Sequence, residues 1–415
     1  MLNELLGLKF NITEKSEEFK NYNGPKFSYT LAPLGDELFF MCKPLLFEKN
    51  IYEINLQIFE WNGLKVFFPT GKSSAFPFDV FAAAFYLVSR YEEYLPYKKD
   101  AHQRFDASES IAFKYNFLDK PLINYWANLL AEKLKSKFPD IEIKTPKYSF
   151  LSTIDIDSAF AYKEKGFVRT LGGIIKSILS LDTHNLMERV NVIIGNQKDP
   201  FDTFEYLQHI TEKYKLKSIY FFLLADYGLN DKNVSHQSLK LQKLIHSIAD
   251  YAEIGIHPGY ASNTDKKKLY TEHQRLEKIL NQHITKSRQH FLKLTLPDTY
   301  RNLIELDITD DYTMGYASQP GFRASIANSF YFYDLDSETE TKLRVHPFMI
   351  MEGTFKYYLN QSPEEFSICA KKLIDETKKV NGEFISLWHN DSLSDTGIWS
   401  GWRKAFEDMI IYATK

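Results

Sequence analysis

From Tyr148 onward, short apolar runs alternate with stretches of helical periodicity, and this alternation limits the possible folds more than any other feature. Strand and helix alternation of this length predicts parallel βαβ units and an α/β fold class. Seven strands in one domain predict a barrel, complete or distorted. The predicted strands are 150–156, 218–224, 253–256, 288–294, 312–315, 343–347 and 384–388, and the predicted helices are 203–214, 236–252, 266–282, 297–306 and 363–380.

The 415 residues are too many for one ordinary hydrophobic core, so a second, smaller unit is expected. The first part of the chain mixes short strands with two strongly amphipathic helices, over 78–94 and 121–138. Pro146 and Lys147 make a plausible junction. We therefore expect a smaller N-terminal α/β domain over residues 1–146 and a (β/α) barrel domain over residues 147–415.

Ionisable residues recur at the ends of the predicted strands, where a barrel gathers its catalytic groups. One such residue would mean little, because a lone histidine is more often a hydrogen-bonded core residue. Several at equivalent strand ends favour a functional site. They are Asp155 and Asp157, His257, Arg288 with His290, Asp310 with Asp311, His346, and His389.

The first of these strand ends reads Thr153-Ile154-Asp155-Ile156-Asp157. Side chains two residues apart on a strand lie on the same face, so Asp155 and Asp157 point together. Two close carboxylates repel each other unless a proton or a cation relieves them. A divalent metal is the simplest relief, and an ion-paired strand end is the alternative.

Two histidines extend this pattern. His257 follows an apolar run and precedes a Pro-Gly turn, and imidazole is a good ligand for zinc, nickel, cobalt or iron ions. His389 follows the last apolar run and could protonate a leaving group. A hydrogen-bonded strand-end histidine remains the alternative for His389.

With these motifs, the chain from about residue 148 resembles the NodB-homology polysaccharide deacetylases, carbohydrate esterase family 4. The whole chain resembles bacterial members that carry an extra N-terminal α/β domain of unknown function. The resemblance rests on five segments, 152–159, 255–260, 288–292, 321–324 and 387–390. It implies a distorted (β/α)₇ barrel and a metal-dependent deacetylase site.

The resemblance assigns roles residue by residue. The family's adjacent aspartates are separated here by Ile156, and we carry the catalytic base to Asp155 and a metal ligand to Asp157. His257 matches the family's first histidine ligand, but the position of the second is Ala261. We therefore expect His290 to replace the missing ligand.

The remaining site expectations concern the acid, the arginines and the aromatic walls. Leu387-Trp388-His389 fits the family's last motif, which makes His389 the general acid. Arg288 or Arg323 would orient substrate or stabilise an oxyanion. Three aromatic residues are candidate walls against a sugar ring, with core packing as the alternative for each: Tyr260, Tyr316 and Trp388.

The function expected from these residues is metal-dependent removal of acetyl groups from a saccharide, with zinc as the first choice and nickel, cobalt or iron as alternatives. Two other functions stay open. The Ala261 departure would suit a non-catalytic saccharide-binding or assembly module of polysaccharide production. Hydrolysis of the C–N bond in a small amide, as in allantoinase-like relatives of the fold, is the third possibility.

Charge and cysteine content narrow the partners and the compartment. A net charge of −3 gives no electrostatic footprint for nucleic acid. Cys42 and Cys369 lie far apart and look unpaired, which fits a reducing compartment. The first ten residues have neither a basic region nor a long apolar stretch, so we expect no signal peptide, no membrane span and a cytoplasmic location. The oligomeric state is left open.

Overall fold

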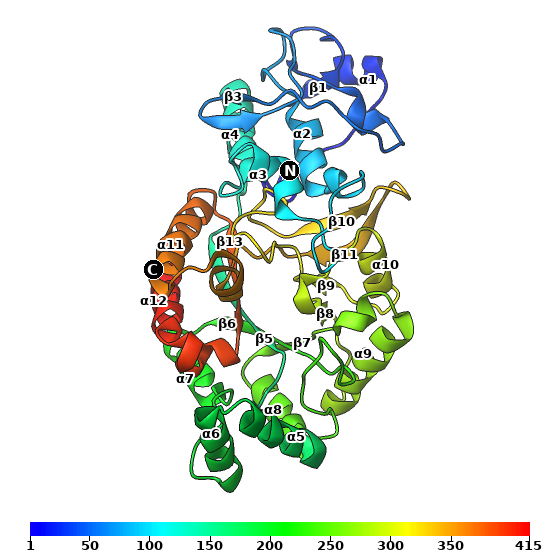
Figure 1. The fold of residues 1–415 in the computed structure, drawn as a ribbon. Helices are drawn as coiled ribbons and strands as arrows, with labels where there is room; N and C mark the ends of the chain where they lie inside the picture. The colour runs from blue at the N-terminus through cyan, green and yellow to red at the C-terminus, as the bar shows by residue number, and fades with distance from the viewer.

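The computed structural model describes residues 1–167, 169–175, 177–183 and 185–415. Figure 1 shows a smaller N-terminal part beside a curved sheet that is surrounded by helices. The N-terminal part holds a parallel pair, β1 and β2, and an antiparallel pair, β3 and β4. Its elements are α1 (Ser16–Asn21), β1 (Phe27–Thr30), β2 (Leu38–Met41), β3 (Phe59–Trp61), β4 (Leu64–Val66), α2 (Val80–Val88), α3 (Ile111–Lys114) and α4 (Leu122–Lys137).

The larger part is built on a nine-stranded sheet in the order β10-β11-β9-β8-β7-β6-β5-β13-β12. Every neighbouring pair is parallel except β10 with β11. Its strands are β5 (Ser149–Ile156), β6 (Lys217–Phe222), β7 (Glu253–Ile256), β8 (Lys286–Ser287), β9 (Asp310–Asp311), β10 (Phe330–Asp334), β11 (Thr339–Val345), β12 (Ile350–Met351) and β13 (Glu383–His389). The sheet curves around a central axis, and its two edge strands, β10 and β12, are not paired with each other.

Helices alternate with these strands and cover the outer face of the sheet (Figure 1). Strand β5 lies between β13 and β6, and its last six residues are buried, as expected of a central parallel strand. The helices are α5 (Gly166–Leu179), α6 (Thr183–Ile194), α7 (Phe204–Tyr214), α8 (Leu239–Ala249), α9 (Lys266–Leu280), α10 (Asp298–Ile304), α11 (Pro363–Lys379) and α12 (Trp402–Thr414). The α/β class expected from the sequence is confirmed.

The strand expected over 288–294 is displaced toward the N-terminus. The structure has the two-residue β8 and then a short 3₁₀ turn, η5 (His290–Leu292). The cause is backbone geometry, because Phe291 and Leu292 adopt φ angles of +59° and +52°. Two consecutive residues in the left-handed region cannot continue a strand. The turn brings His290 back toward β7, since its N–H donates to the carbonyl of Pro258.

The N-terminal part is joined to the larger part by buried charges. Arg323 donates two hydrogen bonds to Glu93, at 3.0 and 2.7 Å. Arg90 also binds Glu93 and donates to the carbonyl oxygen of Arg323. All three side chains are almost fully buried. That residues 1–146 form a separate domain stays a prediction. No helix in the described residues is both long and apolar enough to cross a membrane.

Candidate metal centre

The candidate site lies where the parallel strands end. Asp155 is the penultimate residue of β5 and pairs in register with His389, at the end of β13. Asp157 follows β5 directly, and His257 follows β7 directly. The His257 N–H donates to the carbonyl of Phe222 on the neighbouring β6, which fixes the backbone there. The sheet itself therefore brings these four side chains to one edge.

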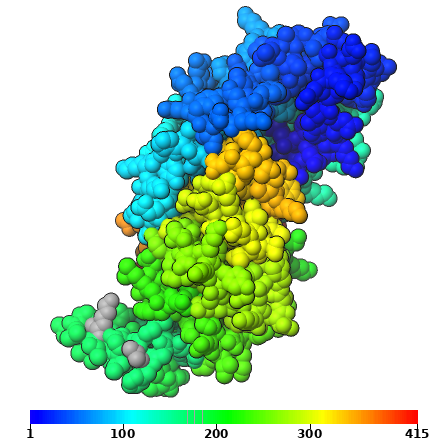
Figure 2. All heavy atoms as spheres, turned by 90° about the vertical axis from the view of Figure 1, so that its right-hand side faces the viewer, coloured from blue at the N-terminus to red at the C-terminus, as the bar shows by residue number. Residues whose placement is uncertain are grey.

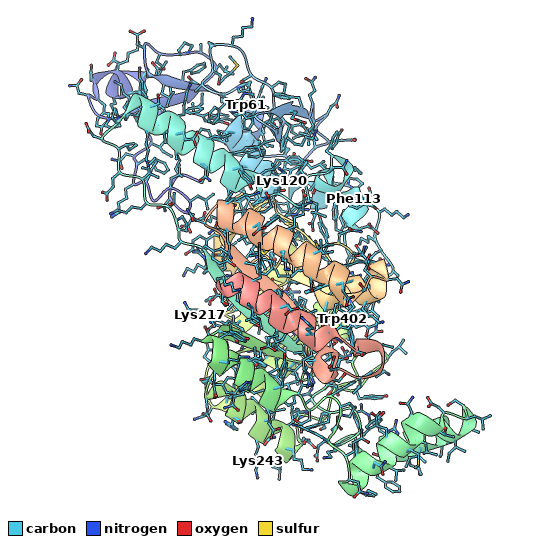
Figure 3. All side chains as sticks on the ribbon, turned by 90° about the vertical axis from the view of Figure 1, so that its left-hand side faces the viewer. Trp61, Phe113, Lys120, Lys217, Lys243 and Trp402 are labelled. Atoms are coloured by element: carbon cyan, nitrogen blue, oxygen red, sulfur yellow. The ribbon has the colours of Figure 1, made fainter. Side chains whose placement is uncertain are left out.

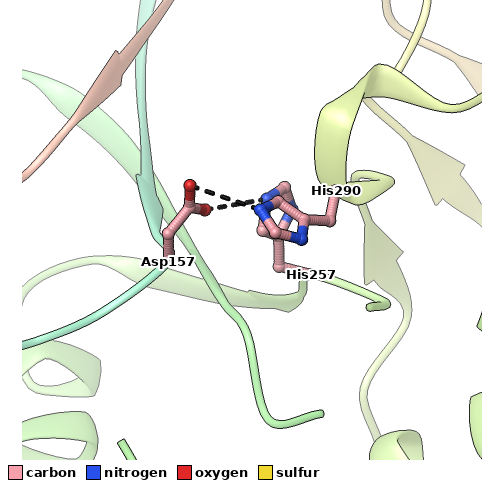
Figure 4. A group of neighbouring side chains, drawn as sticks. All are labelled: Asp157, His257 and His290. Atoms are coloured by element: carbon pink, nitrogen blue, oxygen red, sulfur yellow. Dashed lines mark ion pairs between the residues drawn. The ribbon is translucent and has the colours of Figure 1, made fainter. Parts of the chain in front are cut away.

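Three of the predicted residues converge on one point, as Figure 4 shows. Asp157 Oδ1 lies 3.2 Å from His257 Nε2, and Asp157 Oδ2 lies 3.4 Å from His290 Nε2. One ligand atom from each of the three residues lies within 4.8 Å of the other two. A set of two imidazoles and one carboxylate suits a divalent zinc, nickel, cobalt or iron ion.

The tautomers of the two histidines follow from their second partners. His257 Nδ1 lies 2.6 Å from the carbonyl oxygen of Arg288, which can only accept, so Nδ1 carries the proton. His290 Nδ1 lies 2.8 Å from Asp231 Oδ1, a carboxylate that also accepts from the Tyr260 N–H. In its neutral form, each ring thus turns the lone pair of Nε2 toward Asp157. Second partners of this kind typically orient histidine ligands.

The electrostatics of the cluster are set by one carboxylate and two imidazoles. Asp157 Oδ1 is buried and has no hydrogen-bond partner among the described residues. Desolvation alone would raise the pKa of Asp157, but the neighbouring His290 and His257 rings outweigh it and hold the pKa well below its ordinary value. Burial alone would lower the pKa of His290, but Asp157 and Asp231 raise it to about 9. The donor set and the unpartnered oxygen fit a divalent metal ion.

Asp155 lies beside this cluster and is held by Arg288. The Arg288 guanidinium donates to Asp155 Oδ1 at 2.9 Å and to Thr153 Oγ1 at 2.7 Å. Asp155 Oδ2 remains 3.8 Å from His257 Nε2. One oxygen of Asp155 is therefore fixed by an arginine, while the other faces the candidate metal centre. Arg288 is fully buried and positions Asp155.

His389 faces the same region and is paired with a glutamate that the sequence analysis missed. His389 Nδ1 lies 2.9 Å from Glu352 Oε1, which also accepts from the His389 N–H at 2.8 Å. Burial alone would lower the pKa of His389, but the fully buried Glu352 outweighs it, and the pKa is raised well above its ordinary value. A protonated imidazole here can donate a proton to a leaving group.

Ala261, at the position where the family has its second histidine, lies in a turn that is held by buried hydrogen bonds. Ala261 lies on a short 3₁₀ turn, and the next residue, Ser262, is buried and donates to Glu272 Oε1 at 2.6 Å. Glu272 Oε2 also accepts from the Gly259 N–H. Glu272 thus holds the Pro-Gly turn that follows His257. The structure places His290, rather than any residue of this turn, next to Asp157 and His257.

Several predicted site residues lie elsewhere. Trp388 is fully buried against Phe366 and Phe406, so it is a core residue and not a substrate wall. Tyr316 is also buried, with its hydroxyl accepting from Arg90. Neighbouring residues of β13 point to opposite faces, so Trp388 and His389 lie on different sides of the strand. Arg323 donates hydrogen bonds to Glu93 and to the Gly315 carbonyl, so its guanidinium holds two parts of the chain together.

Tyr260 does lie beside the cluster. It is half-buried, and its ring contacts Phe291, which itself packs on the His290 ring with centroids 4.6 Å apart. His102, from the N-terminal part, packs on both Tyr260 and Phe291. An aromatic rim next to His290 therefore draws on both parts of the chain.

Asp231 and Glu352 had no local signal in the sequence. Asp231 lies in the loop after β6, between residues that show no periodic pattern. Glu352 follows β12, which is only two residues long. A carboxylate next to a histidine in space, rather than in sequence, leaves no spacing to detect. Only the folded sheet reveals these partners.

Comparison with known proteins gives likenesses for both parts. Residues 1–139 match a family of unknown function, DUF7033. No curated protein matches the chain. Among solved structures, a putative polysaccharide deacetylase from Mycobacterium smegmatis is 12% identical with a TM-score of 0.42, covering 65% of this chain and 84% of its own. Puue allantoinase is 11% identical with a TM-score of 0.41, covering 64% and 83%.

A carbohydrate esterase family 4 pseudoenzyme from Bacillus anthracis is also similar, at 10% identity and a TM-score of 0.31, covering 64% of this chain and 60% of its own. The similar structures thus include deacetylases, an allantoinase and a protein described as a pseudoenzyme. At these values the likeness does not decide among their activities.

Proposed function

We propose that this protein is a metal-dependent hydrolase that removes acetyl groups from a saccharide. The observation that carries the proposal is the convergence of Asp157, His257 and His290, with Asp155 on one side and His389 on the other. Asp157, His257 and His290 would hold the cation. A bound divalent cation supplies Lewis acidity toward an acetyl carbonyl and lowers the pKa of a bound water.

The chain's own groups supply the proton transfers. Asp155 accepts a proton from the attacking water through Oδ2, because Oδ1 is occupied by Arg288. The water oxygen bonds to the acetyl carbon, and the bond from that carbon to the sugar nitrogen breaks. His389 then donates its proton to the departing nitrogen, which leaves acetate and a free amine. Glu352 holds His389 for this step.

The first test is metal content, because it shows whether His290 is a metal ligand or only lies near the site. We expect about one equivalent of divalent metal in the purified protein and strong loss in His290→Ala, as in Asp157→Ala and His257→Ala. The matched control is His283→Ala, since His283 is an exposed histidine bonded to Glu277. Elemental analysis of the four variants gives the result. Full metal content in His290→Ala would contradict its assignment as a ligand.

The second test separates the base from the ligands. Asp155→Asn keeps the shape of the side chain and should retain metal, while turnover of an N-acetylated oligosaccharide falls by roughly 10²–10⁴-fold, the usual contribution of a general base. Metal content and acetate release are measured on the same preparation. A protein that binds metal but releases no acetate from any acetylated sugar would point instead to a non-catalytic saccharide-binding module.

A further inference from the structure

Helices α5 and α6 form a hairpin that stands away from the rest of the molecule. Figure 2 shows it projecting from the body at the lower left, and Figure 3 shows the same hairpin at the lower right. It leaves the fold just after Asp157, and the Lys165 ammonium at its base donates to Ser158 Oγ. The hairpin therefore emerges beside the candidate metal centre.

The hairpin concentrates exposed apolar side chains. Among the described residues, ten of the chain's 28 exposed large hydrophobic side chains fall within residues 166–194. The turn between the helices is the most exposed part, with Leu179 80% and Leu181 86% exposed. The ten are Phe167, Leu171, Ile175, Ile178, Leu179, Leu181, Met187, Val190, Ile193 and Ile194. Soluble surfaces seldom gather so many, and such patches mark interaction sites.

The orientation of α5 is the reverse of that in an ordinary surface helix. Its apolar residues Phe167, Leu171, Ile175 and Ile178 follow helical spacing and are all exposed. Its polar residue Arg169 instead points to the body and donates to the carbonyls of Lys232 and Asn233. An amphipathic helix normally buries its apolar stripe. The described residues therefore leave the apolar stripe of α5 largely uncovered.

Positive charge and an aromatic ring lie at the base of the hairpin, where α5 meets the body. The Arg169 guanidinium lies 4.0 Å from the centroid of the Tyr227 ring, and the Lys232 ammonium lies 4.7 Å from it. Tyr227 is itself exposed. Among the described residues, no carboxylate lies within 4 Å of either cation. Residues 163–194 hold five basic and three acidic residues, in a chain whose net charge is −3.

We propose that the α5–α6 hairpin docks on the surface of an anionic lipid bilayer, with its apolar face in the headgroup region. An apolar stripe on one side of a helix, with Lys or Arg on the opposite side, is typical of helices that lie in a membrane interface, and tyrosines are enriched at that depth. Anionic lipids attract such basic groups.

Vesicle co-sedimentation of the full-length protein tests the proposal. We expect binding to vesicles of phosphatidylglycerol and phosphatidylcholine, weaker binding to phosphatidylcholine alone, and loss of affinity at high salt. The double variant Leu179→Ser/Leu181→Ser should bind at least tenfold more weakly. The matched control is Leu239→Ser/Ile368→Ser, which changes two similarly exposed residues outside the hairpin. Thermal unfolding by circular dichroism verifies that all forms are folded.

Three outcomes would overturn the proposal: no wild-type binding to anionic vesicles, unchanged binding by the hairpin variant, or equal loss in the control. A wild-type dimer that dissociates in Leu179→Ser/Leu181→Ser, without any vesicle binding, would identify a second copy as the partner and also overturn it. The assay requires neither metal nor turnover. Its failure is therefore distinct from failure of the proposed hydrolase activity.

Discussion

At the scale of single residues, the second hydrogen-bond partner of each histidine determines which role that histidine can have. The Arg288 carbonyl and the Asp231 carboxylate decide that His257 and His290 present Nε2 toward Asp157. Glu352 has a different effect, because its negative charge raises the pKa of His389 and so stabilises the protonated imidazole. The same residue type thus serves as a ligand candidate or an acid candidate according to its second partner.

We expect Glu352→Gln to separate these two roles. The amide can still accept a hydrogen bond, but it no longer offers the negative charge that stabilises the His389 imidazolium. Release of acetate from an N-acetyl sugar should fall by roughly 10–100-fold, whereas hydrolysis of an aryl acetate, whose leaving group needs no proton, should change little. Parallel assays on the two substrates, with metal content as the control, give the answer. Equal losses on both would contradict an acid role for His389.

At the scale of elements, two features set the geometry of the site edge. Strand β5 is held on both sides by parallel neighbours, so Asp155 has a fixed register against His389. Helix α11 then packs behind β13, where Phe366 contacts Trp388, the residue before His389. Its N-terminus carries a capping box, in which Ser362 Oγ accepts from the Glu365 N–H and Glu365 accepts from the Ser362 N–H.

Removing this cap should lower stability without touching the site. We expect Ser362→Ala to lower the free energy of unfolding by about 1 kcal/mol, the usual cost of a lost N-cap. Metal content should stay at the wild-type level, since no candidate ligand lies on α11. Ser16→Ala is the control, because Ser16 is the first residue of α1 and makes no cap bond. Denaturant unfolding monitored by fluorescence measures both.

At the scale of the whole molecule, the two parts are joined by charged side chains that are buried and desolvated. Glu93 accepts from both Arg90 and Arg323, and all three are buried at the contact between the N-terminal part and the sheet. Such a network is costly to break because each partner left behind is a buried, uncompensated charge. Arg104 adds a second tie, donating to the carbonyl of Phe291, next to His290.

Glu93→Gln should therefore destabilise the protein strongly. Loss of the carboxylate leaves Arg323 without a negative partner, and breaking a buried pair costs about 3–5 kcal/mol. The control is Glu60→Gln, since the Glu60–Lys65 pair is exposed and should contribute little. Thermal unfolding of the two variants makes the comparison. A Glu93→Gln protein as stable as Glu60→Gln would show that the two parts do not depend on this network.

The sequence was informative where periodicity and strand ends carry the signal. Strand β7 was predicted at the residues where it occurs, and Asp157 and His257 were singled out because each follows a buried run. Their roles, like that of His290, stay predictions. Features that depend on backbone conformation or on partners distant in the chain left no such pattern. Nothing in the sequence indicated positive φ at Phe291, the pairing of Glu352 with His389, or the exposed face of α5.

The base of the α5–α6 hairpin has a consequence for regulation. Lys165 is bonded to Ser158, which follows Asp157, and Arg169 is bonded to the carbonyl of Lys232, which follows Asp231. Each bond joins the hairpin to the residue that follows a member of the site, Asp157 in one case and Asp231 in the other. If the centre binds a cation, the position of the hairpin and the affinity for the ion would be linked, and such linkage works in both directions.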